Sequence, residues 1–174
     1  MKPCVVIAGP PGSGKSTVGP LLAQHLGVDF RDSDDEIVLR AGRPIADIFT
    51  TDGEPAFRAL EESVIAELLA DHEGVLSLGG GAVLASRTRE RLRGHEVVFL
   101  NVGFATGVKR VGLSTARPLL AGVNPRTTYR SLLEARLPVY REVATIEVDT
   151  DERSPADLAA AIAAELTTKL EKAQ

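Results

Sequence analysis

GPPGSGKST, residues 9–17, is the stretch of sequence that decides the fold. It fits the P-loop pattern G-x-x-x-x-G-K-[ST]. The apolar run from Cys4 to Ala8 before it predicts a buried strand, and the residues from Lys15 to Leu26 after it predict a helix. A strand, a glycine-rich loop and a helix in this order distinguish a phosphate-binding loop from a chance match.

The residue types of this loop suit a bound nucleoside triphosphate. Its glycines let the backbone curl so that successive N–H groups point at an anion, and the helix N-terminus adds a partial positive charge. The ammonium of Lys15 can reach the terminal phosphates, and the hydroxyl of Ser16 can bind Mg²⁺. The alternative is a glycine-rich turn with a solvated lysine. The motif does not identify the molecule that receives the phosphate.

Length and composition indicate one soluble domain over residues 1–174. The net charge of −4 and the lack of a basic run argue against nucleic acid as a partner. The single cysteine, Cys4, excludes a disulfide within the chain, which fits a reducing cytosol. We see no signal peptide and no apolar run near the ~20 residues that span a bilayer. We therefore expect a cytoplasmic protein that does not bind membranes.

Short apolar strands alternate with helical patterns along the chain. Ala56–Leu69 carries a helical apolar stripe, and Ser154 followed by Pro155 starts a last helix that extends to about Leu170. The pattern predicts an α/β fold: a five-stranded, mostly parallel sheet with helices on both faces. The expected strands are Cys4–Ala8, Val28–Arg31, Val75–Leu78, Val97–Val102 and Ala144–Val148.

Pro20 lies inside the helix that follows the P-loop. A proline there removes one backbone hydrogen bond and crowds the preceding turn, at a cost of ~3 kcal/mol if nothing relieves it. We therefore predict a kink or a loosened turn over Ser16–Pro20.

Two carboxylates follow the second expected strand, where ligands bind in parallel sheets. Asp32 and Asp34 have i, i+2 spacing and face the same side if the backbone is extended. One could support Mg²⁺, and the other could accept a proton from an acceptor hydroxyl. Alternatively, the acidic residues from Asp34 onward only complement a helix N-terminus behind a Ser33 cap. Spacing alone does not separate these interpretations.

For each of the other candidate residues, a functional role and a purely structural one are both possible. Arg58 could bind a carboxylate while Glu61 holds its geometry, or the two could form a solvated ion pair. Gly79–Gly81 allow close approach of a ligand, or form a flexible turn. Gly112–Asn124 resembles a mobile lid that brings Arg117 onto the transferring phosphate, or an exposed loop with a solvated arginine.

Taken together, these motifs resemble those of the shikimate kinase family from the P-loop to about Pro155. The elements that carry the resemblance, beyond the P-loop, are Asp32-Ser33-Asp34, Phe57-Arg58-Ala59-Leu60-Glu61, Leu78-Gly79-Gly80-Gly81-Ala82, Arg117-Pro118-Leu119-Leu120 and Arg136 before Pro138-Val139-Tyr140. The resemblance implies transfer of the γ-phosphoryl group of ATP to the 3-hydroxyl of shikimate, a step in aromatic amino acid biosynthesis. It also implies an acceptor-binding region at about residues 33–61, a lid at about residues 112–124 and a monomer.

The resemblance also implies roles for individual residues. Lys15, Asp34 and Arg117 are expected to be catalytic, with Asp34 holding the acceptor hydroxyl. Ser16 and Asp32 are expected to serve Mg²⁺. ATP is expected to contact Gly12, Ser13, Gly14, Lys15, Ser16, Thr17, Arg110, Arg117, Arg153 and Pro155. Shikimate is expected to contact Asp34, Phe49, Phe57, Arg58, Glu61, Gly79, Gly80, Gly81, Pro118, Leu119 and Arg136.

A catalytically inactive binding module is disfavoured because every expected site residue is present. Two other functions also compete with this interpretation. The first is a different small-molecule or nucleoside monophosphate kinase, which the combination of Arg58 and Arg136 disfavours because these arginines suit a carboxylated acceptor. The second is a nucleotide switch, which is expected to carry an Asn-Lys-x-Asp motif that this sequence lacks.

Overall fold

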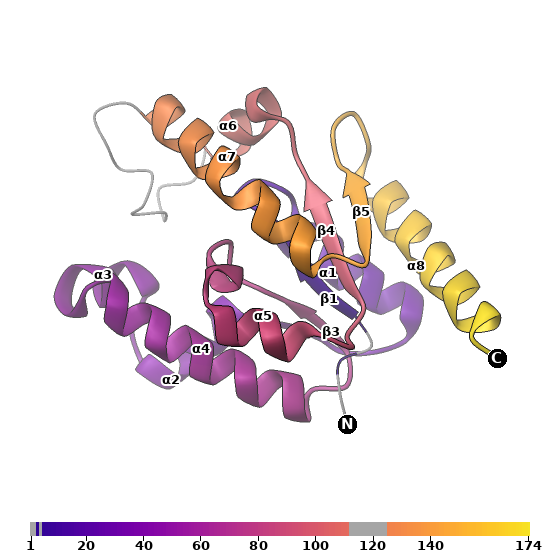
Figure 1. Ribbon diagram of the computed structural model, residues 1–174, viewed down its shortest axis with the longest axis horizontal. Coiled ribbons are helices and arrows are strands. Elements are labelled where there is room, and N and C mark those ends of the chain that lie inside the picture. The colour runs from indigo at the N-terminus through magenta and orange to yellow at the C-terminus, as the bar shows by residue number, and fades with distance from the viewer. Residues whose placement is uncertain (1–2, 4, 112–124) are drawn as a thin grey trace.

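A five-stranded sheet forms the centre of the computed structural model, which describes residue 3, residues 5–111 and residues 125–174 (Figure 1). The strands lie in the order β2-β3-β1-β4-β5, and all four pairings among them are parallel. The predicted fold class is therefore confirmed. The strands are β1 (Val5–Ala8), β2 (Phe30–Asp32), β3 (Val75–Ser77), β4 (Val97–Asn101) and β5 (Ile146–Asp149).

Helices connect the strands and cover both faces of the sheet. The helix after the P-loop has the predicted bounds, and the last helix begins after Ser154, whose Oγ accepts a hydrogen bond from the N–H of Asp157 at 3.1 Å. The helices are α1 (Lys15–Leu26), α2 (Ser33–Ala41), α3 (Ile45–Asp52), α4 (Glu54–Asp71), α5 (Ser86–Leu92), α6 (Phe104–Val111), α7 (Pro125–Val143) and α8 (Pro155–Lys172), with a 3₁₀ turn η1 (Ala82–Leu84).

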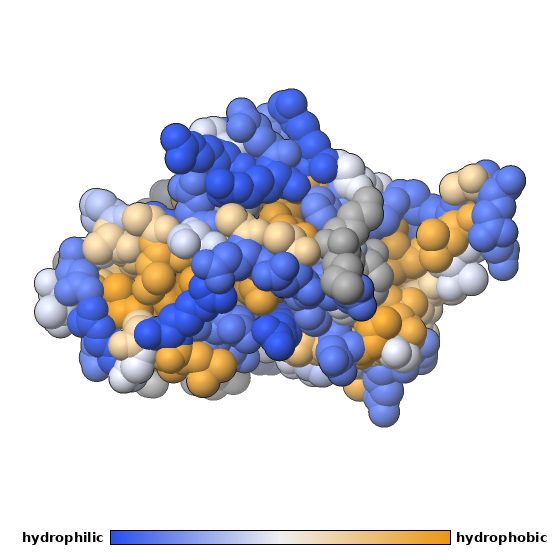
Figure 2. Space-filling view, turned by 90° about the horizontal axis from the view of Figure 1, so that it is seen from below, coloured by the Kyte–Doolittle hydropathy of each residue, from blue (hydrophilic) through white to orange (hydrophobic). Residues whose placement is uncertain are grey.

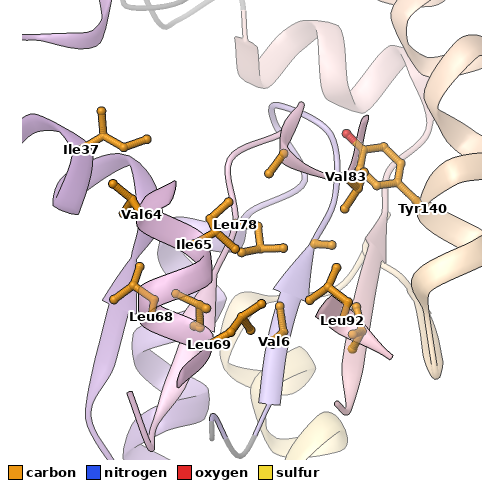
Figure 3. Packing of buried hydrophobic residues seen from close by; sticks show 14 of the residues in the cluster. Val6, Ile37, Val64, Ile65, Leu68, Leu69, Leu78, Val83, Leu92 and Tyr140 are labelled. Carbon is orange, nitrogen blue, oxygen red and sulfur yellow. The ribbon is translucent and has the colours of Figure 1, made fainter. Parts of the chain in front are cut away.

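Alternating side chains of the central strand divide the core into two layers. Val6 and Ala8 pack in a cluster with residues of α2, α4, α5 and α7, of which Ile37, Ile65, Leu92 and Tyr140 are labelled in Figure 3. Val5 and Ile7 pack in a second cluster under α1 and α8. Because β1 is buried on both faces, it is apolar throughout, as the sequence indicated.

The face of the molecule in Figure 2 is largely hydrophilic, with smaller apolar patches between the polar groups. This mixture is usual for the surface of a globular domain. Among the described residues, no helix combines the length and the apolar composition needed to cross a bilayer.

The boundaries of the second strand differ from the prediction. β2 begins at Phe30 and not at Val28, because the N–H of Val28 donates to the carbonyl of Ala23 and completes the end of α1. Helix α1 continues through Pro20 without a break. Since Pro20 has no N–H, one carbonyl of α1 lacks its usual donor, and a kink of the helix axis stays a prediction. Cys4 and the expected lid, residues 112–124, lie outside the described residues.

Candidate active site at the carboxyl edge of the sheet

The loops that follow β1, β2 and β3 meet around one cavity of about 360 Å³. Parallel strands bring their carboxyl ends to the same edge, so residues far apart in sequence converge there. The cavity is lined by Gly12, Gly14, Lys15, Ser16, Thr17, Asp32, Asp34, Leu78, Gly79, Gly80, Arg110 and Val111. Ten of the predicted site residues are therefore brought together.

The P-loop has the backbone geometry of an anion site. Gly12 and Gly14 have φ values of 83° and 96°, which side chains other than glycine rarely adopt. Gly14 is the N-cap of α1, and no side chain caps this helix end. The first N–H groups of α1 consequently remain able to bind phosphate oxygens at the positive end of the helix dipole.

Lys15 is buried beneath the loop. Its Nζ donates to the carbonyl oxygens of Gly9 at 2.7 Å and Pro10 at 3.0 Å. Only 8% of Lys15 is exposed, so a positive charge is held in a poorly hydrated place beside the N-terminus of α1. Such a charge interacts more strongly with a phosphate than an exposed one does.

The two aspartates lie in different backbone environments, contrary to the predicted extended pair. Asp32 ends β2 and is the N-cap of α2, where its Oδ1 accepts from the N–H of Asp34 at 2.8 Å. Asp34 lies in the first turn of α2. Ser33 is not the cap, because its buried Oγ accepts from the N–H of Gly79 at 3.0 Å. Both carboxylates still line the cavity.

The surroundings of Asp32 fit a hydrated Mg²⁺ ion. Burial, followed by the neighbouring carboxylate of Asp34, raises the pKa of Asp32 from 3.8 to about 6, and Lys15 lowers it less strongly. Ser77 is paired with Asp32 across the sheet and thus projects from the same face. Among the described residues, its fully buried Oγ has no hydrogen-bond partner. A carboxylate with excess negative charge, an orphaned hydroxyl and the hydroxyl of Ser16 suit a cation that retains water ligands.

Arg58 and Glu61 form an ion pair that is mostly buried, and the solvated alternative is wrong. Nη1 of Arg58 donates to Oε1 of Glu61 at 2.9 Å, and the side chain of Glu61 is 4% exposed. Burial raises the pKa of Glu61 above its ordinary value. The guanidinium groups of Arg58 and Arg136 reduce this rise without cancelling it. Next to the pair, the rings of Phe57 and Phe49 are 4.7 Å apart, and Phe57 lies 5.2 Å from the guanidinium of Arg58.

The glycine triplet is packed tightly by these charged groups, so it is not a flexible turn. A Cβ on Gly79 would lie 2.7 Å from Oδ1 of Asp34 and 2.9 Å from Oε2 of Glu61. A Cβ on Gly81 would collide with the guanidinium of Arg58. The triplet therefore allows the acceptor-side residues to converge on one loop.

Other predicted site residues do not line the cavity or lie outside the part of the chain that the structure describes. Arg136, on α7, is buried, and its charge acts on Glu61. Nη1 of Arg110, which does line the cavity, donates to the carbonyl of Gly12 at 2.9 Å. Arg153 and Pro155 follow β5 and do not line the cavity. Arg117, Pro118 and Leu119 lie outside the described residues.

Comparison with known proteins agrees with this geometry. The family model described as shikimate kinase matches residues 11–170. The chain belongs to the shikimate kinase family. A shikimate kinase of Saccharopolyspora erythraea is 65% identical over 155 residues, which cover 89% of each chain. One of Thermobifida fusca is 56% identical over 165 residues, 95% of each chain.

Solved structures support the same assignment. The shikimate kinase from Acinetobacter baumannii in complex with shikimate has a TM-score of 0.92 and 38% identity, covering 97% of this chain and 94% of that chain. As a shikimate kinase, the chain is an ATP-dependent enzyme that phosphorylates a hydroxyl of shikimate.

Four residues of this shikimate kinase have contacts that the sequence did not predict. Ser33 holds Gly79, and Ser77 lies beside Asp32, as described above. Tyr129 and Tyr140 of α7 donate hydrogen bonds to the carbonyls of Pro11 and Gly80. A sequence signal for the tyrosines does exist, because they are the only two in the chain and are spaced to lie on one face of a helix.

Proposed function

We propose that the 3-hydroxyl of shikimate attacks the γ-phosphate of ATP in this cavity, giving shikimate 3-phosphate and ADP. The observation that supports this most strongly is that Asp34, the P-loop, Gly79 and Gly80 line the same cavity. A carboxylate facing a phosphate cradle suits the transfer of a phosphoryl group to a hydroxyl, since it can orient the hydroxyl and accept its proton.

On the acceptor side, Arg58 and Arg136 would bind the carboxylate of shikimate. Both lie near Glu61, which holds Arg58 in place and offsets part of the positive charge. Phe49 and Phe57 would contact the ring of the substrate, and Gly79–Gly81 would allow it to approach the backbone. A small acid with several hydroxyls needs such arginines and a closely fitting pocket.

On the donor side, Lys15 and the backbone of Gly12–Thr17 would bind the phosphates of ATP. Ser16 and Asp32 would hold Mg²⁺, and the Oγ of Ser77, next to Asp32 in the sheet and without a partner among the described residues, could hydrogen-bond a water of that ion. When bound, Mg²⁺ neutralises part of the charge on the phosphates. Arg110 contacts the P-loop and would lie beside the nucleotide together with Arg153 and Pro155.

The remaining assignments concern the whole enzyme. Arg117 would stabilise the transferring phosphoryl group, and Pro118 and Leu119 would contact shikimate, within a lid at about residues 112–124. Residues 33–61 would form the acceptor-binding region of a single domain over residues 1–174. The single cysteine supports a cytoplasmic location, and we propose that the enzyme acts as a monomer.

A coupled assay for ADP release tests the reaction. Shikimate, gluconate and nucleoside monophosphates are supplied in turn with ATP and Mg²⁺, and the product formed from shikimate is located by NMR. We expect turnover with shikimate alone and phosphate on its 3-oxygen. Turnover no higher than background with shikimate would exclude the proposal.

A further inference from the structure

The only two tyrosines of the chain both lie on α7 and are both 1% exposed. The hydroxyl of Tyr129 donates to the carbonyl of Pro11 in the P-loop at 2.6 Å. The hydroxyl of Tyr140 donates to the carbonyl of Gly80 in the glycine triplet. One helix therefore holds both the loop that binds the phosphate donor and the loop that borders the acceptor.

The spacing of these residues places them on one face of α7. Positions seven and eleven residues apart on a helix differ in direction by about 20°, so Tyr129, Arg136 and Tyr140 point the same way. The two tyrosines are about 16 Å apart along the helix axis. Arg136, the proposed ligand of the substrate carboxylate, lies between them. Figure 3 shows Tyr140 extending from α7, with its hydroxyl at the end of the ring farthest from the helix.

The two anchored loops are themselves in contact. A Cβ added to Gly80 would lie 3.0 Å from Cδ of Pro11, which is the residue whose carbonyl Tyr129 holds. Packing around each ring limits its movement: Tyr140 stacks on Phe99 at 5.0 Å, and Tyr129 lies 6.3 Å from Phe104. A side chain at Gly107 would collide with the hydroxyl of Tyr129, so this glycine of α6 leaves room for the hydrogen bond.

We propose that Tyr129 and Tyr140 are positioning residues, and that α7 is a spacer that sets the distance between the phosphate donor and the acceptor hydroxyl. This inference rests on the proposed assignment of the two loops to ATP and shikimate. Tyr129 acts through the P-loop on the binding of ATP. Tyr140 acts through Gly80 on the binding of shikimate. Neither hydroxyl takes part in the chemistry.

The first test compares Tyr129→Phe and Tyr140→Phe in steady-state kinetics. Each variant keeps the aromatic ring and removes the hydroxyl that donates to a loop carbonyl. We expect Tyr129→Phe to raise the KM for ATP about five- to tenfold, with the KM for shikimate changed less than about twofold. We expect Tyr140→Phe to raise the KM for shikimate about five- to tenfold and to change the KM for ATP less than about twofold. Equal changes in both constants, or no change in either, would overturn the proposal.

The second test uses the tyrosines as their own probes, because the chain has no tryptophan. In Tyr140→Phe the tyrosine fluorescence comes from Tyr129 alone, and in Tyr129→Phe it comes from Tyr140 alone. We expect ADP to change the first signal and shikimate to change the second. The opposite pairing, or one common response to both ligands, would contradict separate anchoring of the two loops.

The two proposals fail in different ways. If the wild-type enzyme does not turn over shikimate, the proposed reaction is wrong. If it does, and the variants show a lower melting temperature without the expected split in KM, the tyrosines are structural and only the inference about α7 is wrong.

Discussion

Arg58 and Glu61 are joined by a hydrogen bond of 2.9 Å in which the acceptor is almost completely buried. Glu61 also lies close to Asp34, since a Cβ on Gly79 would touch both carboxylates. The pair consequently links the proposed carboxylate-binding arginine to Asp34, the residue proposed to hold the acceptor hydroxyl.

Replacing Glu61 with Gln should weaken the binding of shikimate. The charge that fixes Arg58 is lost while the shape is retained, so we expect the KM for shikimate to rise by about tenfold and the KM for ATP to stay unchanged. In the wild type, the KM for shikimate should rise as the pH falls through the raised pKa of Glu61. That pH dependence should be absent from Glu61→Gln; if it persists, another group is responsible.

Replacing Asp34 with Asn tests its role toward the acceptor hydroxyl. An amide cannot accept the proton, so we expect kcat to fall by about 10²- to 10⁴-fold. The exposed neighbour Asp35 is a matched control, and Asp35→Asn should keep kcat within about twofold. Retention of most of kcat by Asp34→Asn would exclude a role in proton transfer.

Asp32 should make the stability of the metal-free enzyme depend on pH. Its pKa of about 6 in the folded state lies above the ordinary 3.8, so the folded state binds the proton more tightly. The free energy of unfolding, measured in EDTA, should therefore fall as the pH rises from about 4 to about 6 and stay low above that range. At 1.36 kcal/mol per pKa unit, the loss is at most about 3 kcal/mol.

Asp32→Asn removes this titration and keeps an N-cap residue for α2. Above pH 6 in EDTA, we expect the variant to unfold at a higher urea concentration than the wild type. Addition of Mg²⁺ with ADP should stabilise the wild type and have a much smaller effect on the variant. A variant less stable than the wild type at every pH would show that the charge of Asp32 stabilises the fold.

Ser33→Ala should lower stability and activity together. The N–H of Gly79 loses its acceptor in a buried place, which costs about 1–3 kcal/mol of unfolding free energy. The control is Ser86→Ala, at an exposed serine. Urea denaturation and the KM for shikimate measure the two effects. If Ser33→Ala and Ser86→Ala behave alike, the hydrogen bond to Gly79 makes no net contribution.

Local patterns in the sequence predicted the fold and the residues that point into the cavity. The P-loop and the ends of the apolar strands placed Lys15, Asp34 and Gly79 at one edge. On the sequence alone, a Ser33 cap of α2 is one of two open alternatives, and the cap is Asp32. Both residue types can cap a helix, and the tertiary contact of Ser33 with Gly79 decides between them. The spacing of the two tyrosines indicates one helix face, but the hydrogen bond of Tyr129 spans 118 residues to a backbone carbonyl, and no local pattern predicts that partner.

The central position of β1 has a consequence for how the protein folds. Val6 pairs with Leu76 on one side and with Val97 on the other, so the strand that carries the P-loop finds its partners only 70 and 91 residues later. Closing such long loops is entropically costly before the contacts form, and sheets paired in this way fold slowly. We therefore expect the strand that carries the P-loop to be fixed late in folding, since a chain emerging from the ribosome can complete the centre of the sheet only after β4 has been made.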